Sequence, residues 1–287
     1  MGEEPADPSM TAARVPVGGT GELALRIVSG FVMAVAAGGL LYAGAIPFAV
    51  LVAIVAVLTS LEWSRIVRGE GFDAALGIQI AAVIAASVLA AAGLGALGLS
   101  ALAVGTILTG LLCFSSRPLL SAEGVLYAGL PAVALIWLRD DASYGLEAVL
   151  FIFIAVIATD VAAYVFGRLI GGPKLAPAIS PKKTWSGFLG GILTAGLCCA
   201  LYASSLGADP VRLGAAGAML GIVAQIGDLT ESALKRSFGV KDSGTLIPGH
   251  GGIMDRVDGL VFAAAAAGFV ALALDPNAPA RALLFGG

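Results

Sequence analysis

Long runs of apolar residues, separated by short turns marked by glycine or proline, extend over most of this chain. A helix needs about 20 mostly apolar residues to cross the hydrocarbon core of a membrane. Nine runs approach that length, near residues 27–45, 47–62, 76–92, 94–114, 123–138, 147–168, 186–205, 212–228 and 258–274. The pattern predicts an all-α fold, a polytopic transmembrane helical bundle of about nine spans.

The polar segments divide the chain into three parts. The first 22 residues are polar and lack the basic start and apolar run of a signal peptide, so we assign residues 1–25 to a disordered tail. Residues 26–145 contain the N-terminal transmembrane helices, and residues 146–287 contain the longer polar loops. Within the first half, segment 62–75 is typical of a polar connection or of a helix lying in the membrane interface.

Composition supports a membrane protein and excludes a soluble domain. Hydrophobic residues make up 59% of the 287 positions, charged residues only 12%, and the mean hydropathy is +0.98. A soluble domain carries roughly 25% charged residues, because polar side chains must cover its surface. The cysteines, Cys113, Cys198 and Cys199, lie in apolar stretches at no zinc-binding spacing and are interpreted as small buried hydrophobic residues.

The positive charges predict the orientation. With nine spans, 13 of the 16 Lys and Arg residues fall on the side of the N-terminus, and only Arg139, Arg212 and Arg281 fall on the other side. Positive residues accumulate on the cytoplasmic side of a membrane. We therefore expect an inner-membrane protein with a cytoplasmic N-terminus. Asp140 and Asp141 would be solvated loop charges on the opposite side, and Trp63 at a span end would be an interfacial anchor.

Two loops of the cytoplasmic side, near 169–185 and 229–257, carry the candidate chemistry. Four carboxylates lie toward the cytoplasmic ends of their spans: Asp160, Asp228, Asp255 and Asp258. Acids inside spans are costly and usually bind something. Mg²⁺ is commonly held by one or two carboxylates and by substrate phosphates, and basic side chains neutralise the remaining phosphate charge. The best such cations are two adjacent pairs, Lys182-Lys183 and Lys235-Arg236.

Each residue alone also has a plainer interpretation. The lysine pair could be anchors that bind anionic lipid headgroups, and Asp228 and Asp255 could be helix caps or ion-pair partners. His250, the only histidine, lies in a Pro-Gly-His-Gly-Gly turn at 248–252 that could cradle phosphate oxygens, but a single loop histidine is often incidental. The combination of acids, bases and a glycine turn on one side favours a phosphate-binding site.

These residues also match a known pattern. Segment 232–258, Ser-Ala-Leu-Lys-Arg-Ser-Phe-Gly-Val-Lys-Asp-Ser-Gly-Thr-Leu-Ile-Pro-Gly-His-Gly-Gly-Ile-Met-Asp-Arg-Val-Asp, resembles the motif of the phosphatidate cytidylyltransferase family. Upstream segments at 166–168, 174–177, 180–185 and 227–229 also resemble that family. There are two departures: Ala162 replaces a frequent Gly, and Ser186 replaces a frequent Glu, which puts a metal or base role at position 186 in doubt.

The resemblance implies a reaction in which a phosphate oxygen of phosphatidic acid attacks the α-phosphorus of CTP, giving CDP-diacylglycerol and pyrophosphate. It implies Mg²⁺ or another divalent cation, alone or with a second metal ion, held by Asp228 and Asp255 with help from Asp258. The other residues implied at the catalytic or substrate site are Lys182, Lys183, Asp160, Ser180, Lys235, Arg236, Lys241, Asp242, His250 and Arg256. The implied partners are CTP, phosphatidic acid and membrane lipid, without nucleic acid, and the family also implies a homodimer.

Two other functions remain open at this point. A CTP-dependent kinase of a lipid alcohol would use the γ-phosphate as the electrophile and release CDP instead of pyrophosphate. A transporter could use Asp160 and Asp228 as ion-coupling groups near broken helices. The clustering of polar loops on one side argues against a transporter, because alternating access needs polar routes on both sides.

Overall fold

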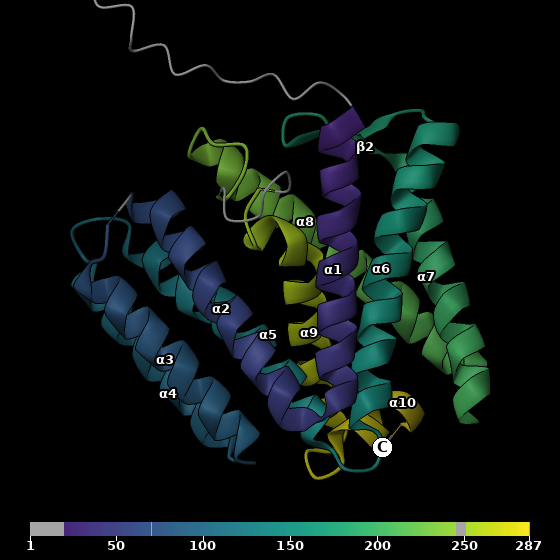
Figure 1. The fold of residues 1–287 in the computed structure, drawn as a ribbon, viewed down its shortest axis with the longest axis horizontal. Coiled ribbons are helices and arrows are strands. Elements are labelled where there is room, and N and C mark those ends of the chain that lie inside the picture. Colours follow the sequence, from purple (N-terminus) through teal and green to yellow (C-terminus); the bar gives the residue numbers. More distant parts are fainter. Residues whose placement is uncertain (1–19, 70, 245–250, 287) are drawn as a thin grey trace, which may run out of the picture.

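The computed structural model describes residues 20–69, 71–244 and 251–286. They form a mostly helical bundle with one small hairpin (Figure 1). The elements are α1 (Thr20–Ala43), α2 (Ala45–Arg68), α3 (Ala74–Ala91), α4 (Gly95–Leu112), α5 (Pro118–Asp140), α6 (Gly145–Leu169), β1 (Lys174–Ala176), β2 (Ser180–Thr184), α7 (Trp185–Leu206), α8 (Pro210–Ser237), α9 (Met254–Leu274) and α10 (Pro279–Phe285).

The predicted all-α membrane fold is confirmed. Among the described residues, eight helices, α2 to α9, are long and apolar enough to cross a membrane, and α1 contains a shorter apolar part at Val32–Ala43. The nine apolar runs of the sequence thus correspond to α1 through α9. The predicted tail at 1–25 lies mostly outside the described residues, and α1 begins inside it at Thr20.

Several helix boundaries at the polar end of the bundle differ from the predicted spans. Helix α2 continues to Arg68, so segment 62–75 is not a separate interfacial helix. Helix α8 continues to Ser237, beyond the predicted end at 228, and α9 begins at Met254, before the predicted 258. An apolar run reports the thickness of the hydrocarbon core, whereas helical hydrogen bonds continue into water. Basic residues in the last turns of α2 and α8 also interact favourably with the helix dipole.

Two groups of helices meet along α5 and α9. Helices α2, α3 and α4 pack on α5, whereas α6, α7 and α8 pack against one another, and α9 contacts both α8 and α5. Of the eight long apolar helices, α5 is the most enclosed, with 67% of an 18-residue apolar stretch buried. In α4 and α7 only 22% of the corresponding stretch is buried, and these helices present apolar side chains outward, as lipid-facing helices do. Helix α10, which the apolar pattern did not predict, packs its buried leucines against the lower part of the bundle.

Small residues allow the second group to pack closely. A Cβ at Gly217 on α8 would overlap the side chain of Cys199 on α7, so only glycine permits this separation of the two helices. Cys199 and Cys113 are buried and Cys198 is half-buried, and all three are free thiols. The prediction of small buried residues is confirmed for Cys113 and Cys199.

The two ends of the bundle differ in architecture. The carboxyl ends of α2 and α8, the amino end of α9 and the β1–β2 hairpin lie together at the top of Figure 1, and we call this the site end. We call the opposite end, with α10 and the C-terminus, the far end. The hairpin is antiparallel, with Lys174 paired to Thr184 and Ala176 to Ser180, inside a segment that the sequence predicted to be a loop.

Candidate active site

The hairpin brings a lysine to the polar face of α8. Asp228, Glu231 and Lys235 follow one another at helical spacing on that face. The Lys183 ammonium of β2 lies 2.6 Å from Asp228 Oδ2, and the hydroxyl of Ser232 donates to Asp228 Oδ1 over 3.4 Å. A predicted phosphate-binding lysine and a predicted metal ligand therefore meet, although they are 45 positions apart in the sequence.

The base of the hairpin is closed by a hydroxyl. Ser186 donates a hydrogen bond to the Gly171 carbonyl over 2.5 Å, and the Trp185 amide donates to the Pro173 carbonyl over 3.1 Å. These bonds tie the start of α7 to the segment that leaves α6. Ser186 thus has a structural contact at the position where the resemblance led us to expect an acid.

Lys235 joins α8 to α9 through two carboxylates. Its ammonium lies 2.7 Å from Glu231 Oε2 on the same helix and 2.6 Å from Asp255 Oδ1 on the next. Glu231 is 1% exposed and Lys235 is 8% exposed. Because a buried ion pair is costly to break by removing one partner, this cluster fixes the position of the two helices relative to each other.

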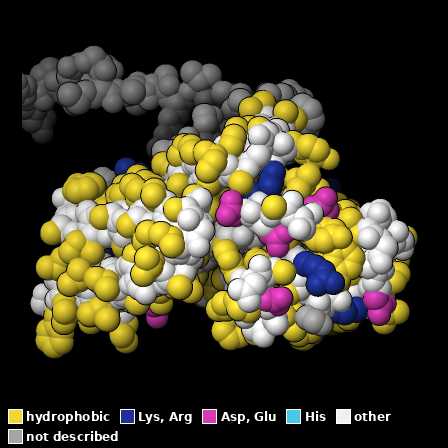
Figure 2. All heavy atoms as spheres, turned by 90° about the horizontal axis from the view of Figure 1, so that it is seen from below, with side chains coloured by type: hydrophobic (Ala, Val, Ile, Leu, Met, Phe, Trp, Pro, Cys, Tyr) yellow, Lys and Arg dark blue, Asp and Glu magenta, His cyan; other side chains and the backbone are white. Residues whose placement is uncertain are grey.

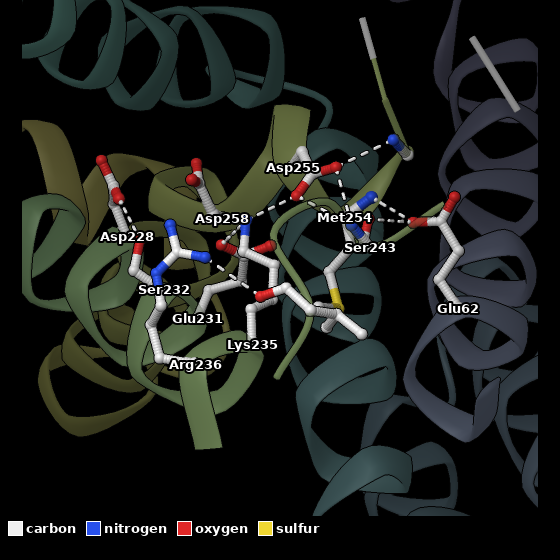
Figure 3. A network of polar contacts seen from close by, with 12 residues as sticks. Glu62, Asp228, Glu231, Ser232, Lys235, Arg236, Ser243, Met254, Asp255 and Asp258 are labelled. Carbon is white, nitrogen blue, oxygen red and sulfur yellow. Dashed lines mark hydrogen bonds and ion pairs between the residues drawn. The ribbon is translucent and has the colours of Figure 1, made fainter. Parts of the chain in front are cut away.

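Asp255 also organises the segment between the helices. The amide of Ser243 donates to Asp255 Oδ2 over 3.0 Å, and the amide of Gly252 donates to the same oxygen over 2.8 Å (Figure 3). With Lys235 on Oδ1, both carboxylate oxygens have partners. The contacts give Asp255 a role in shaping the loop, and its predicted role as a metal ligand stays a prediction.

Asp258 lies one turn further along α9. Figure 3 shows its side chain on the same side as Asp228, away from the Asp255 contacts. Its Oδ1 accepts a hydrogen bond of 2.7 Å from the Gly259 amide. Asp160, Asp228 and Asp258 are close enough for their charges to interact with one another and with Lys183. The three predicted acids from α6, α8 and α9 therefore converge at the site end.

A sequence comparison decides the family. The profile of the Cytidylyltransferase family matches residues 24–274, which is most of the chain. The chain belongs to the cytidylyltransferase family.

Individual members of this family are similar over a shorter range. The phosphatidate cytidylyltransferase of Brucella suis biovar 1 is 51% identical over 161 residues, which cover 55% of this chain and 59% of that protein. That of Brucella abortus biovar 1 is 53% identical over 146 residues, covering 50% and 54%. That of Staphylococcus saprophyticus is 44% identical over 137 residues, covering 45% and 51%. The chain spans just over half the length of the curated relatives it matches.

The other predicted site residues of this cytidylyltransferase-family chain belong to β2, to the end of α8 and to the segment that runs from α8 into α9. The guanidinium of Arg236 donates to the Val240 carbonyl over 3.0 Å and closes the turn after α8. Lys182, Lys241, Asp242 and Arg256 are exposed, and Ser180 is half-buried at the start of β2. His250 and the preceding residues of the Pro-Gly-His turn lie outside the described residues. Of the predicted cations, the structure brings Lys183 and Lys235 into contact with the acids.

The donor set of this family member is compatible with a magnesium ion. In the described ranges, no three His, Cys, Asp or Glu side chains are arranged as a preformed metal cage. Asp228 and Asp258 nevertheless present two carboxylates on one side of α8 and α9. Mg²⁺ is typically bound by one or two carboxylates, with substrate phosphates and water completing its shell. These two residues fit that pattern better than Asp255, whose oxygens already have three donors.

The sequence interpretation missed one buried acid, Glu62. It placed this residue at the start of a polar connection, but Glu62 lies in the last turns of α2 and is 3% exposed. The neighbouring Trp63, interpreted as an interfacial anchor, is also buried, and its indole nitrogen donates to the Leu120 carbonyl over 2.8 Å. The available signal was an acid at the end of an apolar span, directly before a tryptophan.

Proposed function

We propose that this protein makes CDP-diacylglycerol and pyrophosphate from CTP and phosphatidic acid at the membrane surface. One observation supports this most directly: Lys183 and Lys235 contact the acids of α8 and α9 at one end of a membrane bundle. Such a site can bind two phosphate-bearing substrates, one from water and one from the bilayer. The names of the similar Brucella and Staphylococcus proteins support the same activity.

The reaction requires two anions to approach each other. A phosphate oxygen of phosphatidic acid forms a bond to the α-phosphorus of CTP, and the bond from that phosphorus to the pyrophosphate oxygen breaks, so that its electron pair leaves with pyrophosphate. The attacking oxygen is already ionised and needs no general base. Catalysis therefore consists of positioning and charge neutralisation.

The residues have distinct proposed tasks. Asp228 and Asp258, with the predicted Asp255, would hold Mg²⁺, which when bound supplies positive charge to the phosphate oxygens. Lys183 lies against Asp228 and is 22% exposed in its side chain, so it can reach a phosphate of either substrate. Lys235 is enclosed by Glu231 and Asp255, and we assign it to holding α8 and α9 in register.

Orientation and assembly are part of the proposal. We propose that the site end faces the cytoplasm of the cell, where CTP is available, because most Lys and Arg residues are assigned to that side. Arg139, at the end of α5, and Arg212, at the start of α8, lie at the far end, which supports the assignment. The homodimer implied by the family remains an expectation, to be measured by light scattering of the purified protein.

The position of the transferred phosphate tests the reaction. Purified protein in phosphatidic acid-containing vesicles is given Mg²⁺ and CTP labelled at either the α- or the γ-phosphate. We expect the α-label in a chloroform-soluble lipid and the γ-label in pyrophosphate. A γ-label in the lipid would identify a CTP-dependent kinase, and the absence of any labelled lipid would contradict both enzyme assignments.

A further inference from the structure

A carboxylate from the N-terminal half of the chain holds the same segment as Asp255. Glu62 Oε1 accepts a hydrogen bond from the Ile253 amide over 2.9 Å. Its Oε2 accepts one from the Met254 amide and one from the Ser243 hydroxyl, each over 2.8 Å. The side chain therefore joins α2 both to the loop that follows α8 and to the first turn of α9.

Glu62 and Asp255 bind the segment between α8 and α9 at the same two places. Asp255 accepts from the amides of Ser243 and Gly252, and Glu62 accepts from the Ser243 hydroxyl and from the two amides that follow Gly252 (Figure 3). Gly252 is closely packed against these groups, because a Cβ added to it would overlap the Ser243 hydroxyl and the Glu62 carboxylate. A small shift of Glu62 must therefore move Ser243 or the start of α9.

Electrostatics favours this arrangement. The first amides of a helix have no partner inside the helix, and the amino end carries a partial positive charge. A carboxylate that accepts from such amides makes charge-assisted hydrogen bonds, which are about twice as strong as neutral ones. Helix α9 has no side-chain cap of its own at Ile253, so Glu62 supplies the cap from another helix.

The support for Glu62 is rigid. Next to it, Trp63 packs on Tyr127 of α5 with ring centroids 4.7 Å apart, and Tyr127 in turn contacts Phe262 of α9 at 6.3 Å. Trp63, Tyr127 and Met254 belong to a buried apolar cluster separate from the main core, and the amide of Met254 also donates to Glu62. Helix α2 is therefore fixed against α5 and α9 at the depth where Glu62 reaches the loop.

We propose that Glu62 is a positioning residue for the cytidylyl transfer. By fixing Ser243 and the first turn of α9, it sets the position of Asp255, and through the Asp255–Lys235 ion pair it sets the polar face of α8. This inference rests on the proposed function. It assigns α2, in the half of the chain that carries no motif residue, a direct part in assembling the site.

The test is Glu62→Gln, which keeps the size of the side chain. A glutamine has one acceptor oxygen, and its amide group would face a backbone or hydroxyl donor, so the three hydrogen bonds cannot all form. We expect kcat per folded protein to fall on the order of 10²-fold, because a displacement of about 1 Å costs that much in a positioned site. Amide exchange at Ile253 and Met254 should become faster, while exchange in α4 and α7 stays unchanged.

A matched control lies at the same end of the bundle. Glu123→Gln changes an exposed acid in the second turn of α5 and should leave kcat and amide exchange as in the unmodified protein. If Glu62→Gln has unchanged kcat, the proposal is wrong. It is also wrong if activity falls only in proportion to the folded fraction measured by thermal unfolding, since that result would mean a purely stabilising role.

Ser243→Ala tests the same contact if Glu62→Gln fails to fold. It removes the hydroxyl donor and keeps the backbone amide that binds Asp255, so we expect kcat to fall about 10-fold. An unchanged kcat in Ser243→Ala would contradict the proposal. Where Glu62→Gln folds, the added loss in that background should be smaller, because the hydroxyl no longer has its full acceptor. Equal losses in both backgrounds would contradict the proposal. If the unmodified protein transfers no CMP, the proposed function fails. The amide-exchange comparison still tests whether Glu62 fixes Ser243 and the first turn of α9.

Discussion

At the site end of the bundle two lysines pair with carboxylates, whereas at the far end two arginines donate to backbone carbonyls. Lys183 contacts Asp228, and Lys235 contacts two acids. At the far end, Arg139 donates to the Leu41 carbonyl over 2.9 Å, and Arg212 donates to the Ala282 carbonyl over 3.0 Å. Lys183 and Lys235 therefore contact acidic side chains at the site end, whereas Arg139 and Arg212 bind the carbonyls of helix ends at the far end.

Two half-buried acids show a similar contrast, because Asp228 at the site end pairs with a lysine, whereas Asp141 binds backbone amides. Asp141 at the far end accepts from the amides of Ser143, Tyr144 and Ala280, at 2.9, 3.1 and 3.2 Å. It is a cap that joins the start of α6 to α10, and not the solvated loop charge that the sequence predicted. Figure 2 views this end and shows its charged side chains scattered among hydrophobic ones. A charged group that is already hydrogen-bonded to the backbone is less available to bind a ligand. A charged group that is paired with another side chain can exchange that partner for a phosphate or a metal ion.

The largest expected effect is that of Asp228→Asn at the site end. This change keeps the shape of the side chain but removes the charge that Lys183 and the proposed Mg²⁺ share. We expect CMP transfer to fall about 10³-fold, the upper range for losing one electrostatic group in an active site. Release of pyrophosphate, measured at saturating CTP, checks this. Because the side chain is 29% exposed, folding should be unaffected, and activity within a few-fold of the unmodified protein would remove Asp228 from the site.

The hairpin offers a comparison between adjacent lysines. Side chains of successive strand residues point to opposite faces, and only Lys183 of β2 contacts Asp228, whereas Lys182 is exposed. We expect Lys183→Met to lower kcat/KM for CTP or phosphatidic acid about 10²-fold. Lys182→Met is the control and should change kcat/KM by less than about 3-fold, as expected of exposed charges. Equal losses would show that charge near the membrane, and not the Asp228 contact, is what matters.

Local patterns predicted the spans and part of the site. Apolar runs located α1 to α9 because lipid imposes a length on each span. The family resemblance identified Lys235 and Asp255, which form an ion pair between α8 and α9, and Asp228, which lies on the same face of α8 as Lys235. Helix ends were misplaced because the end of an apolar run marks the edge of the hydrocarbon core and not the end of helical hydrogen bonding.

Contacts between distant parts of the chain could not be predicted in this way. Glu62 and Ile253 are 191 positions apart, and Asp141 and Ala280 are 139 apart. Whether such an acid is solvated or caps a helix depends on which helix ends lie beside it, and periodicity carries no information about that. The hairpin was missed for a related reason, since its two strands are short and carry lysine and proline.

Two glycines distinguish steric crowding at the site end from backbone strain at the far end. Gly252→Ala would place a Cβ against Ser243 and Glu62. We expect kcat to fall at least about 10-fold, because the added methyl group must separate Glu62 from Ser243. Gly93 has a φ of +76°, and a Cβ added there would meet no other atom within 4 Å, so Gly93→Ala should cost only backbone strain, about 1 kcal/mol of stability. Activity per folded protein separates the two, and a loss in Gly93→Ala would contradict the comparison.

The smallest effect on activity is expected from Asp141→Asn. One of its two oxygens becomes an amide group that faces a backbone donor, so at least one of three hydrogen bonds is lost. We expect the free energy of unfolding to fall by about 1–3 kcal/mol, seen as a lower melting temperature in detergent, with kcat unchanged. Asp140→Asn, at the exposed neighbouring position, is the matched control and should leave both quantities unchanged. A loss of CMP transfer in Asp141→Asn without a loss of stability would mean that the far end is coupled to the site, because capping alone cannot alter the distance between Lys183 and Asp228.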